Sequence, residues 1–99
     1  MTITVKLYGR IREKLGREEV KVEDDVKTVG ELVDELDSIS GHKLEELFFD
    51  PGTREIRPSF VMLVNGHSIR LLKGMDTMLF GNNDIVIDNI DIMETVGGG

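Results

Sequence analysis

The sequence predicts an α+β domain in which one main helix packs against one face of a mixed sheet of about five strands. Three observations lead to this prediction: apolar and polar residues alternate near the N-terminus, a capped amphipathic helix follows, and further β-rich runs surround a hairpin signal. The 99 residues are enough for one domain with a single modest core.

The N-terminal elements are two short strands. Ile3, Val5 and Leu7 alternate with polar residues, and Val20 and Val22 repeat the pattern. This alternation of β-branched and polar residues is typical of half-buried strands. The two runs are expected to form a hairpin, whose connector carries a helical turn over residues 10–14.

The main helix follows this hairpin. Thr28 and Glu31 have the spacing of a capping box, in which the two side chains satisfy each other's backbone N–H groups. Apolar residues then recur at the spacing of one helix face: Val29, Leu32, Val33 and Leu36. This stripe is expected to face the sheet. A shorter helical turn over residues 44–48 precedes the turn signal Asp50-Pro51-Gly52.

The second half of the chain predicts another hairpin and a last strand. Residues 60–64 are β-rich, Asn65-Gly66 is the preferred pair for a type I′ turn, and residues 67–72 are expected to return as the partner strand. Residues 73–83 form a loop or short helical segment. The last strand lies within 84–93, where the apolar residues fit two alternations joined at Asp88-Asn89.

This order of elements is that of the β-grasp (ubiquitin-like) fold. Its first and last strands would run parallel at the centre of the sheet, with the helix on one face and the other face open. The alternation in residues 3–7 fits a strand with one buried and one open face.

Composition argues against several classes of function. The 12 Lys and Arg against 19 Asp and Glu give a net charge of −7, which disfavours a nucleic-acid or membrane partner. Without Cys, and with two His far apart, no disulfide, thiol nucleophile or metal site is expected. The sequence has no convergent acid–base pair, so neither an autonomous active site nor a bound cofactor is expected. No membrane span or secretory signal is visible, so a cytoplasmic location is expected.

The last six residues carry most of the functional information. We expect residues 1–93 to form the β-grasp domain and residues 94–99, Glu-Thr-Val-Gly-Gly-Gly, to form a flexible tail. Terminal glycines can simply be a frayed end, because Gly is costly to order. The functional alternative is a peptide without side chains that threads a narrow tunnel in a partner. Its α-carboxylate is a poor electrophile until the partner activates it, for instance by adenylation.

Three segments resemble the MoaD/ThiS family of ubiquitin-like sulfur carriers, which includes the small subunit of molybdopterin synthase and the small archaeal protein modifiers. These segments are VKLYGRIRE at 5–13, LVNG at 63–66 and DNIDIMETVGGG at 88–99. The resemblance implies that an E1-like enzyme, using ATP, adenylates Gly99, which sulfur transfer then converts to a thiocarboxylate. It also implies that the chain is not an enzyme on its own, because the catalytic residues lie in its partners.

The resemblance assigns further roles within the tail. Gly98 and Gly99 match the diglycine of the family, and Val96 matches the residue that usually precedes it, so Val96, Gly97 and Gly98 would thread the partner. Many relatives have two prolines where this chain has Glu94 and Thr95. The tail is therefore expected to be less stiff than theirs.

The resemblance also implies a docking surface. If Leu7 faces the helix, Tyr8 faces outward, and if Ile92 faces inward, Met93 faces outward. In the family an exposed apolar pair at these positions, with Arg12 nearby, belongs to the patch that meets the enzyme partners. A single exposed Tyr and Met would otherwise need no explanation.

The function that the resemblance implies is a sulfur carrier for molybdenum-cofactor biosynthesis, acting as the small subunit of molybdopterin synthase. Its partners would be an E1-like adenylating enzyme and the large synthase subunit. One alternative is a ubiquitin-like modifier joined through Gly99 to lysines of target proteins. Others are a carrier for thiamine synthesis or tRNA thiolation, and an adaptor whose tail is inert.

Overall fold

The computed structural model describes residues 3–23, 25–53, 55–79 and 89–95 of the chain. Within these ranges the chain forms five strands, three α-helices and two short 3₁₀ helices: β1 (Ile3–Leu7), α1 (Arg10–Leu15), β2 (Glu19–Val22), α2 (Val29–Ile39), α3 (Lys43–Phe48), β3 (Phe60–Val64), β4 (His67–Ser68), η1 (Ile69–Leu71), η2 (Gly74–Asp76) and β5 (Asn89–Glu94).

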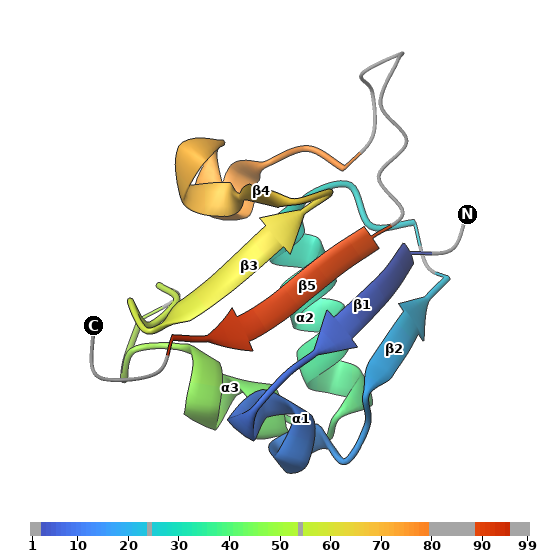
Figure 1. The fold of residues 1–99 in the computed structure, drawn as a ribbon, viewed down its shortest axis with the longest axis vertical. Coiled ribbons are helices and arrows are strands. Elements are labelled where there is room, and N and C mark those ends of the chain that lie inside the picture. Colours follow the sequence, from blue (N-terminus) through green and yellow to red (C-terminus); the bar gives the residue numbers. More distant parts are fainter. Residues whose placement is uncertain (1–2, 24, 54, 80–88, 96–99) are drawn as a thin grey trace.

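The strands form one mixed sheet in the order β2-β1-β5-β3-β4 (Figure 1). β1 and β5 are parallel neighbours at its centre, with Val5 opposite Ile90. The other pairings are antiparallel: Val5 also faces Val20 on β2, and Ile92 faces Met62 on β3. This is the predicted β-grasp arrangement, with the first and last strands parallel in the middle.

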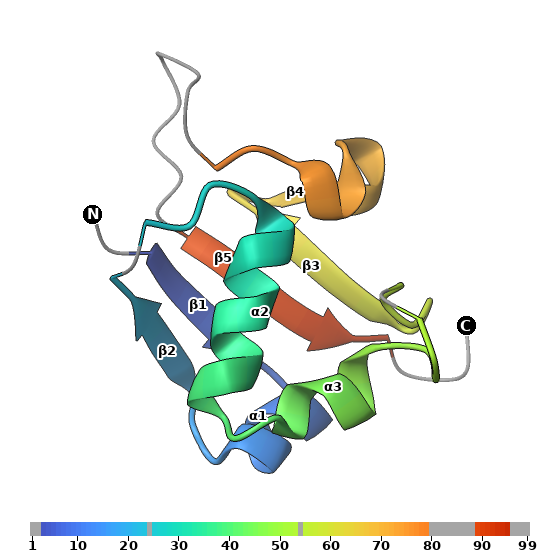
Figure 2. The ribbon, with the colours of Figure 1, turned by 180° about the vertical axis from the view of Figure 1, so that it is seen from behind.

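Helix α2 covers one face of the sheet, as the view from behind shows (Figure 2). Its start is the predicted capping box: the Thr28 hydroxyl accepts from the Glu31 N–H at 3.2 Å, and the Glu31 carboxylate accepts from the Thr28 N–H at 3.0 Å. The predicted apolar stripe is buried: Val29, Leu32, Val33 and Leu36. Burial of these four side chains against the inward residues of the sheet forms the core.

The two short helices close one end of this core. Ile11 on α1 and Phe48 on α3 are fully buried. The Phe48 ring packs edge-to-face on Phe60 of β3, with ring centroids 5.4 Å apart. Both helices were expected from the sequence, and both lie at the end of the sheet where β5 terminates (Figure 1).

The second hairpin differs from the prediction. Asn65 and Gly66 both have positive φ, 49° and 86°, as a type I′ turn requires. The prediction of a strand over 67–72 was wrong, because β4 ends at Ser68. The Ser68 side chain accepts from the Arg70 N–H at 3.3 Å, so it caps η1 and turns the backbone out of the sheet.

The last strand extends beyond its predicted end. β5 runs over Asn89–Glu94, and Thr95 continues the pairing by donating its N–H to the Ser59 carbonyl at 2.7 Å. Glu94 and Thr95, placed in the tail by the sequence, are thus held by the domain. Residues 84–88, which we also assigned to this strand, lie outside the described residues. Along the described parts of the chain, no helix has the length and apolar character that crossing a bilayer requires.

Candidate functional site

Tyr8 lies where β1 ends and stands on the open face of the sheet. Its N–H donates to the Ile92 carbonyl at 3.1 Å, which continues the β1–β5 pairing by one residue. Its phenol donates to the Asp91 carboxylate at 3.0 Å, and the ring side chain remains exposed. This hydrogen bond, more than the nearby charge, raises the pKa of Tyr8 above its ordinary value.

Met93 lies on the same face, one strand further along the sheet. It is opposite Val61 on β3, while Leu63 is opposite Asp91. Cross-strand partners share a face, and side chains alternate between faces along a strand. Tyr8, Val61, Leu63 and Met93 therefore form an open-face patch, within which the three aliphatic side chains are half-buried.

Val61 and Leu63 were missed at the level of sequence. The signal was present, because residues 60–64 are apolar on both faces of the strand, whereas residues 3–7 alternate. A strand that is apolar on both faces either is covered on both or leaves an apolar surface exposed. Here the outward residues of β3 join the two predicted docking residues, Tyr8 and Met93.

Arg12 is placed differently from the other predicted docking residues. It lies on α1 with its side chain about half exposed, and its guanidinium is 3.8 Å from the Glu18 carboxylate. Among the hydrogen bonds and ion pairs of the described residues, none joins Arg12 to Tyr8 or Met93. The structure thus brings Tyr8 and Met93 onto one surface, whereas Arg12 lies on the helix that follows Tyr8 and pairs with Glu18.

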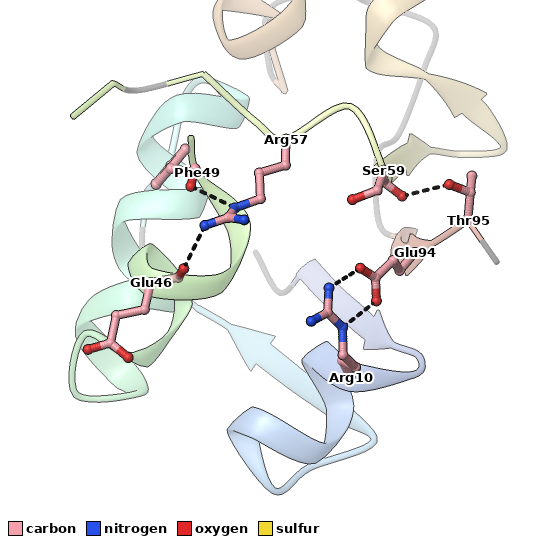
Figure 3. Close-up of polar contacts among 7 residues, drawn as sticks. All are labelled: Arg10, Glu46, Phe49, Arg57, Ser59, Glu94 and Thr95. Carbon is pink, nitrogen blue, oxygen red and sulfur yellow. Dashed lines mark hydrogen bonds and ion pairs between the residues drawn. The ribbon is translucent and has the colours of Figure 1, made fainter. Parts of the chain in front are cut away.

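The root of the tail is held at the end of β5 by two sets of contacts (Figure 3). The Arg10 guanidinium pairs with the Glu94 carboxylate through two nitrogens, with the Nε–Oε1 distance at 2.8 Å. The pair lowers the pKa of Glu94, mainly through hydrogen bonding, and raises that of Arg10. Thr95 donates both its N–H and its hydroxyl to the Ser59 carbonyl, at 2.7 and 3.1 Å. The predicted thiocarboxylate residue Gly99 and the predicted threading residues, Val96, Gly97 and Gly98, lie outside the described residues.

In the described part of the chain, one group of side chains has ligand atoms close enough to hold a metal ion: Asp37, His42 and Glu45. Both oxygens of the Asp37 carboxylate are already engaged, by the His42 Nδ1 at 2.8 Å and by the Glu45 N–H at 2.9 Å. The Asp37 carboxylate raises the pKa of His42. These contacts join the end of α2 to the start of α3, so we interpret the group as a helix junction.

In architecture the molecule is a ubiquitin-like β-grasp domain whose central strand leads into a glycine-rich segment. Residues 5–99 match the ThiS family, and the chain belongs to this family of ubiquitin-like sulfur carriers. Over 99 residues, which is all of both chains, it is 28% identical to a protein of Archaeoglobus fulgidus named as a sulfur carrier protein.

Solved structures share the fold along almost the whole chain. The small archaeal modifier protein 1 of Methanosarcina acetivorans is 26% identical, with a TM-score of 0.76 over 99% of this chain and 96% of that one. A Pyrococcus furiosus protein named as subunit 1 of the molybdopterin converting factor is 20% identical, with a TM-score of 0.66 over 97% of this chain and 99% of that one. The second likeness shows the common fold.

Proposed function

We propose that this protein carries sulfur as a thiocarboxylate on Gly99. The observation that carries the proposal is the course of β5: the central strand brings the chain out of the domain at Thr95, and Val-Gly-Gly-Gly follows in the sequence. Membership of the ThiS family supports the same chemistry. Four extended residues beyond Thr95 reach about 14 Å, which is enough to enter the active site of a partner.

The chemistry proceeds in two steps on the terminal carboxylate. An oxygen of the Gly99 carboxylate attacks the α-phosphorus of ATP, which forms an acyl-adenylate and releases pyrophosphate. Hydrosulfide, or a donor equivalent to it, then attacks the acyl carbon and expels AMP, which leaves a thiocarboxylate and one proton. The chain supplies the reacting carboxylate and a surface by which its partners hold it, and the partners supply the catalytic groups.

The open-face patch supplies that surface in this proposal. Its residues lie on β3 and β5 and directly after β1, three neighbouring strands of the sheet, and Met93 is six residues from Gly99 in the sequence. A partner that covers the patch would therefore have the tail within reach. Burial of half-exposed aliphatic side chains and an aromatic ring is the kind of contact that dominates binding energy at interfaces.

Among the functions of sulfur carriers, we propose that this chain acts in molybdopterin synthesis. The activated chain would dock, as small subunit, onto the large subunit of molybdopterin synthase, where the thiocarboxylate donates sulfur to a pterin precursor. The segments at 5–13, 63–66 and 88–99, which resemble the MoaD/ThiS family, support this assignment. Cells lacking the gene should lose molybdenum-cofactor enzymes and regain them with the wild-type chain, whereas a chain without Gly99 should fail to restore them.

A second candidate is a protein modifier, in which a target lysine amine attacks the acyl-adenylate and expels AMP to form an isopeptide bond. The observation that favours it is the 26% identity to the small archaeal modifier protein 1 of Methanosarcina acetivorans. Isopeptide-linked remnants of the tail on cellular lysines would support this candidate. One protein could serve both roles, because both begin with the same adenylate.

The deciding experiment is intact-mass analysis of the chain incubated with its activating enzyme, ATP and hydrosulfide. A species in which one oxygen is exchanged for sulfur, absent when ATP is omitted, supports the carrier. A matched variant extended by one residue beyond Gly99 should give no such species. If the wild-type chain yields neither adenylate nor thiocarboxylate, or if the mature protein does not end at Gly99, the proposed function is wrong.

A further inference from the structure

The root of the tail is fastened from two sides of β5. On one side Arg10 of α1 pairs with Glu94, and on the other the Ser59 carbonyl accepts twice from Thr95 (Figure 3). We call these four residues, Arg10, Ser59, Glu94 and Thr95, the tail clamp. The pairs join residues 84 and 36 positions apart, so only the folded domain can make them.

The segment around Ser59, whose carbonyl accepts from Thr95, is itself held by hydrogen bonds. Arg57, two residues before Ser59, donates to the carbonyls of Phe49 and Glu46 at 3.0 and 3.3 Å, which ties this segment to α3 (Figure 3). Arg70 donates to the carbonyls of Phe60 and Arg57 at 2.7 and 3.2 Å. The backbone on both sides of the Ser59 carbonyl is thus held by contacts that do not involve Thr95.

The Arg10–Glu94 side of the tail clamp is also anchored to the sheet. α1 begins two residues after Tyr8, whose N–H still bonds to the Ile92 carbonyl, so Arg10 starts from a backbone that is anchored to β5. Glu94 follows the inward residues Ile90 and Ile92 by strand alternation, and its side chain is only 16% exposed, against 61% for Arg10. The Arg10–Glu94 contact therefore starts from the face of β5 opposite to the open-face patch.

We propose that the tail clamp positions the tail for the activating enzyme, by fixing the chain through Thr95, four residues before Gly99. This inference rests on the proposed function. Contacts from α1 and from the segment before β3 restrict the backbone at Glu94 and Thr95.

The size of the effect follows from conformational entropy. A tail residue that has lost its contact with the domain must have its backbone fixed again when the tail binds a partner. Fixing the backbone of one residue weakens binding by about tenfold. Loss of the Arg10–Glu94 pair should therefore lower kcat/KM for adenylation about tenfold. We expect most of this loss in KM for the carrier, with kcat within about twofold, because the reacting carboxylate and the catalytic groups are unchanged.

The test measures adenylation of the full chain by its activating enzyme, as ATP–pyrophosphate exchange, over a titration of the carrier. The variants are Arg10→Gln, Glu94→Gln and the charge-swapped pair Arg10→Glu with Glu94→Arg. Lys14→Gln is the matched control, because Lys14 lies on the same helix and makes an exposed ion pair with Glu46 at 3.5 Å. The single variants should raise KM, and the swapped pair should restore most of the loss.

A second measurement needs no enzyme. Hydrogen exchange of the Thr95 amide should be slow in the wild-type chain and faster in Arg10→Gln, while core amides keep their protection. Thr95→Val, which loses the hydroxyl but keeps the N–H, should show an intermediate rate.

The outcomes separate the clamp from the function on which it depends. If the wild-type chain is adenylated and both single variants match Lys14→Gln in KM, the positioning role is overturned. An unprotected Thr95 amide in the wild-type chain overturns it as well. If the wild-type chain is not adenylated at all, it is the proposed function that fails, whatever the amide shows.

Discussion

The phenol of Tyr8 donates a 3.0 Å hydrogen bond to the Asp91 carboxylate, which joins the end of β1 to the middle of β5 across 83 positions of sequence. Tyr8 is the only tyrosine in the chain, and there is no tryptophan. Its titration can therefore be followed in the near-ultraviolet spectrum without interference from another phenol or an indole. The bond also fixes the ring at the edge of the open-face patch.

We expect the Tyr8 phenol to titrate above its ordinary pKa of 10.0. The protonated phenol is the form that donates to Asp91, so the bond persists below the ordinary value and is lost as pH rises through the raised pKa. In Asp91→Ala the titration should return to the ordinary range. A wild-type midpoint at or below the ordinary value would show that the bond does not form in solution.

Met93 tests the open-face patch. Met93→Ala should weaken binding to the activating enzyme by about tenfold, because truncation of an interface centre typically has this effect. Leu71→Ala is the control, since Leu71 is 83% exposed and lies outside the patch. Titration calorimetry of both variants provides the comparison. Equal affinity for the two variants would place the docking surface elsewhere.

The Arg10–Glu94 pair gives stability a defined pH dependence. The pKa of Glu94 is lowered in the folded chain, so the pair stabilises the fold above the ordinary value of 4.5 and this contribution disappears as pH falls through the lowered pKa. Wild type should therefore melt at a higher temperature than Arg10→Gln at neutral pH. Melting curves recorded at decreasing pH should converge for the two chains, and a gap that is constant down to strong acid would contradict the pairing.

The capping box of α2 should contribute measurably to stability. Thr28→Ala removes the acceptor of the Glu31 N–H, and the free energy of unfolding should fall by about 1 kcal/mol. Thr28→Ser keeps a hydroxyl in the same place and should remain close to wild type. Urea denaturation of the three chains measures the difference, and a loss of equal size in Thr28→Ser would assign the effect to the lost methyl group.

Truncations separate the tail from the domain. A chain ending at Gly97 should melt like wild type, because glycines have no side chains to bury, but it should form no thiocarboxylate. A chain ending at Met93 also loses the contacts of Glu94 and Thr95 and should melt at a lower temperature. Thermal melts and intact-mass analysis of both chains test this. A large loss of stability in the chain that ends at Gly97 would mean that the last two glycines are structural.

The parts of the fold that local patterns encode were predicted from the sequence. The Thr28–Glu31 box and the alternation of residues 3–7 depend on neighbours within a few positions, and both elements formed as expected. The strand assigned to residues 67–72 failed because Ser68 caps η1 and Arg70 reaches back to the carbonyls of Phe60 and Arg57. Such competition between a side chain and the sheet for backbone groups leaves no periodic signal.

The candidate site was predicted only in part, because some of its contacts join residues that are far apart in the sequence. Tyr8 and Met93 followed from alternation together with the family resemblance, and the structure places them on one face. The tail clamp could not be predicted, since its partners meet only when β5 has inserted between β1 and β3. A charged residue at position 94 looked like the start of a solvated tail, although in the fold it is the last residue of a central strand.

The central position of β5 also governs how the molecule bears a mechanical load. β1 and β5 run parallel and are neighbours, so a pull between the start of β1 and the end of β5 slides one strand along the other. Their interstrand bonds are then strained together rather than one after another, and the β3 ladder shares the force. An unfolding enzyme that pulls on the C-terminus would meet the greatest resistance at the start of the pull. A domain that a partner binds by its C-terminus should therefore stay folded while it is bound.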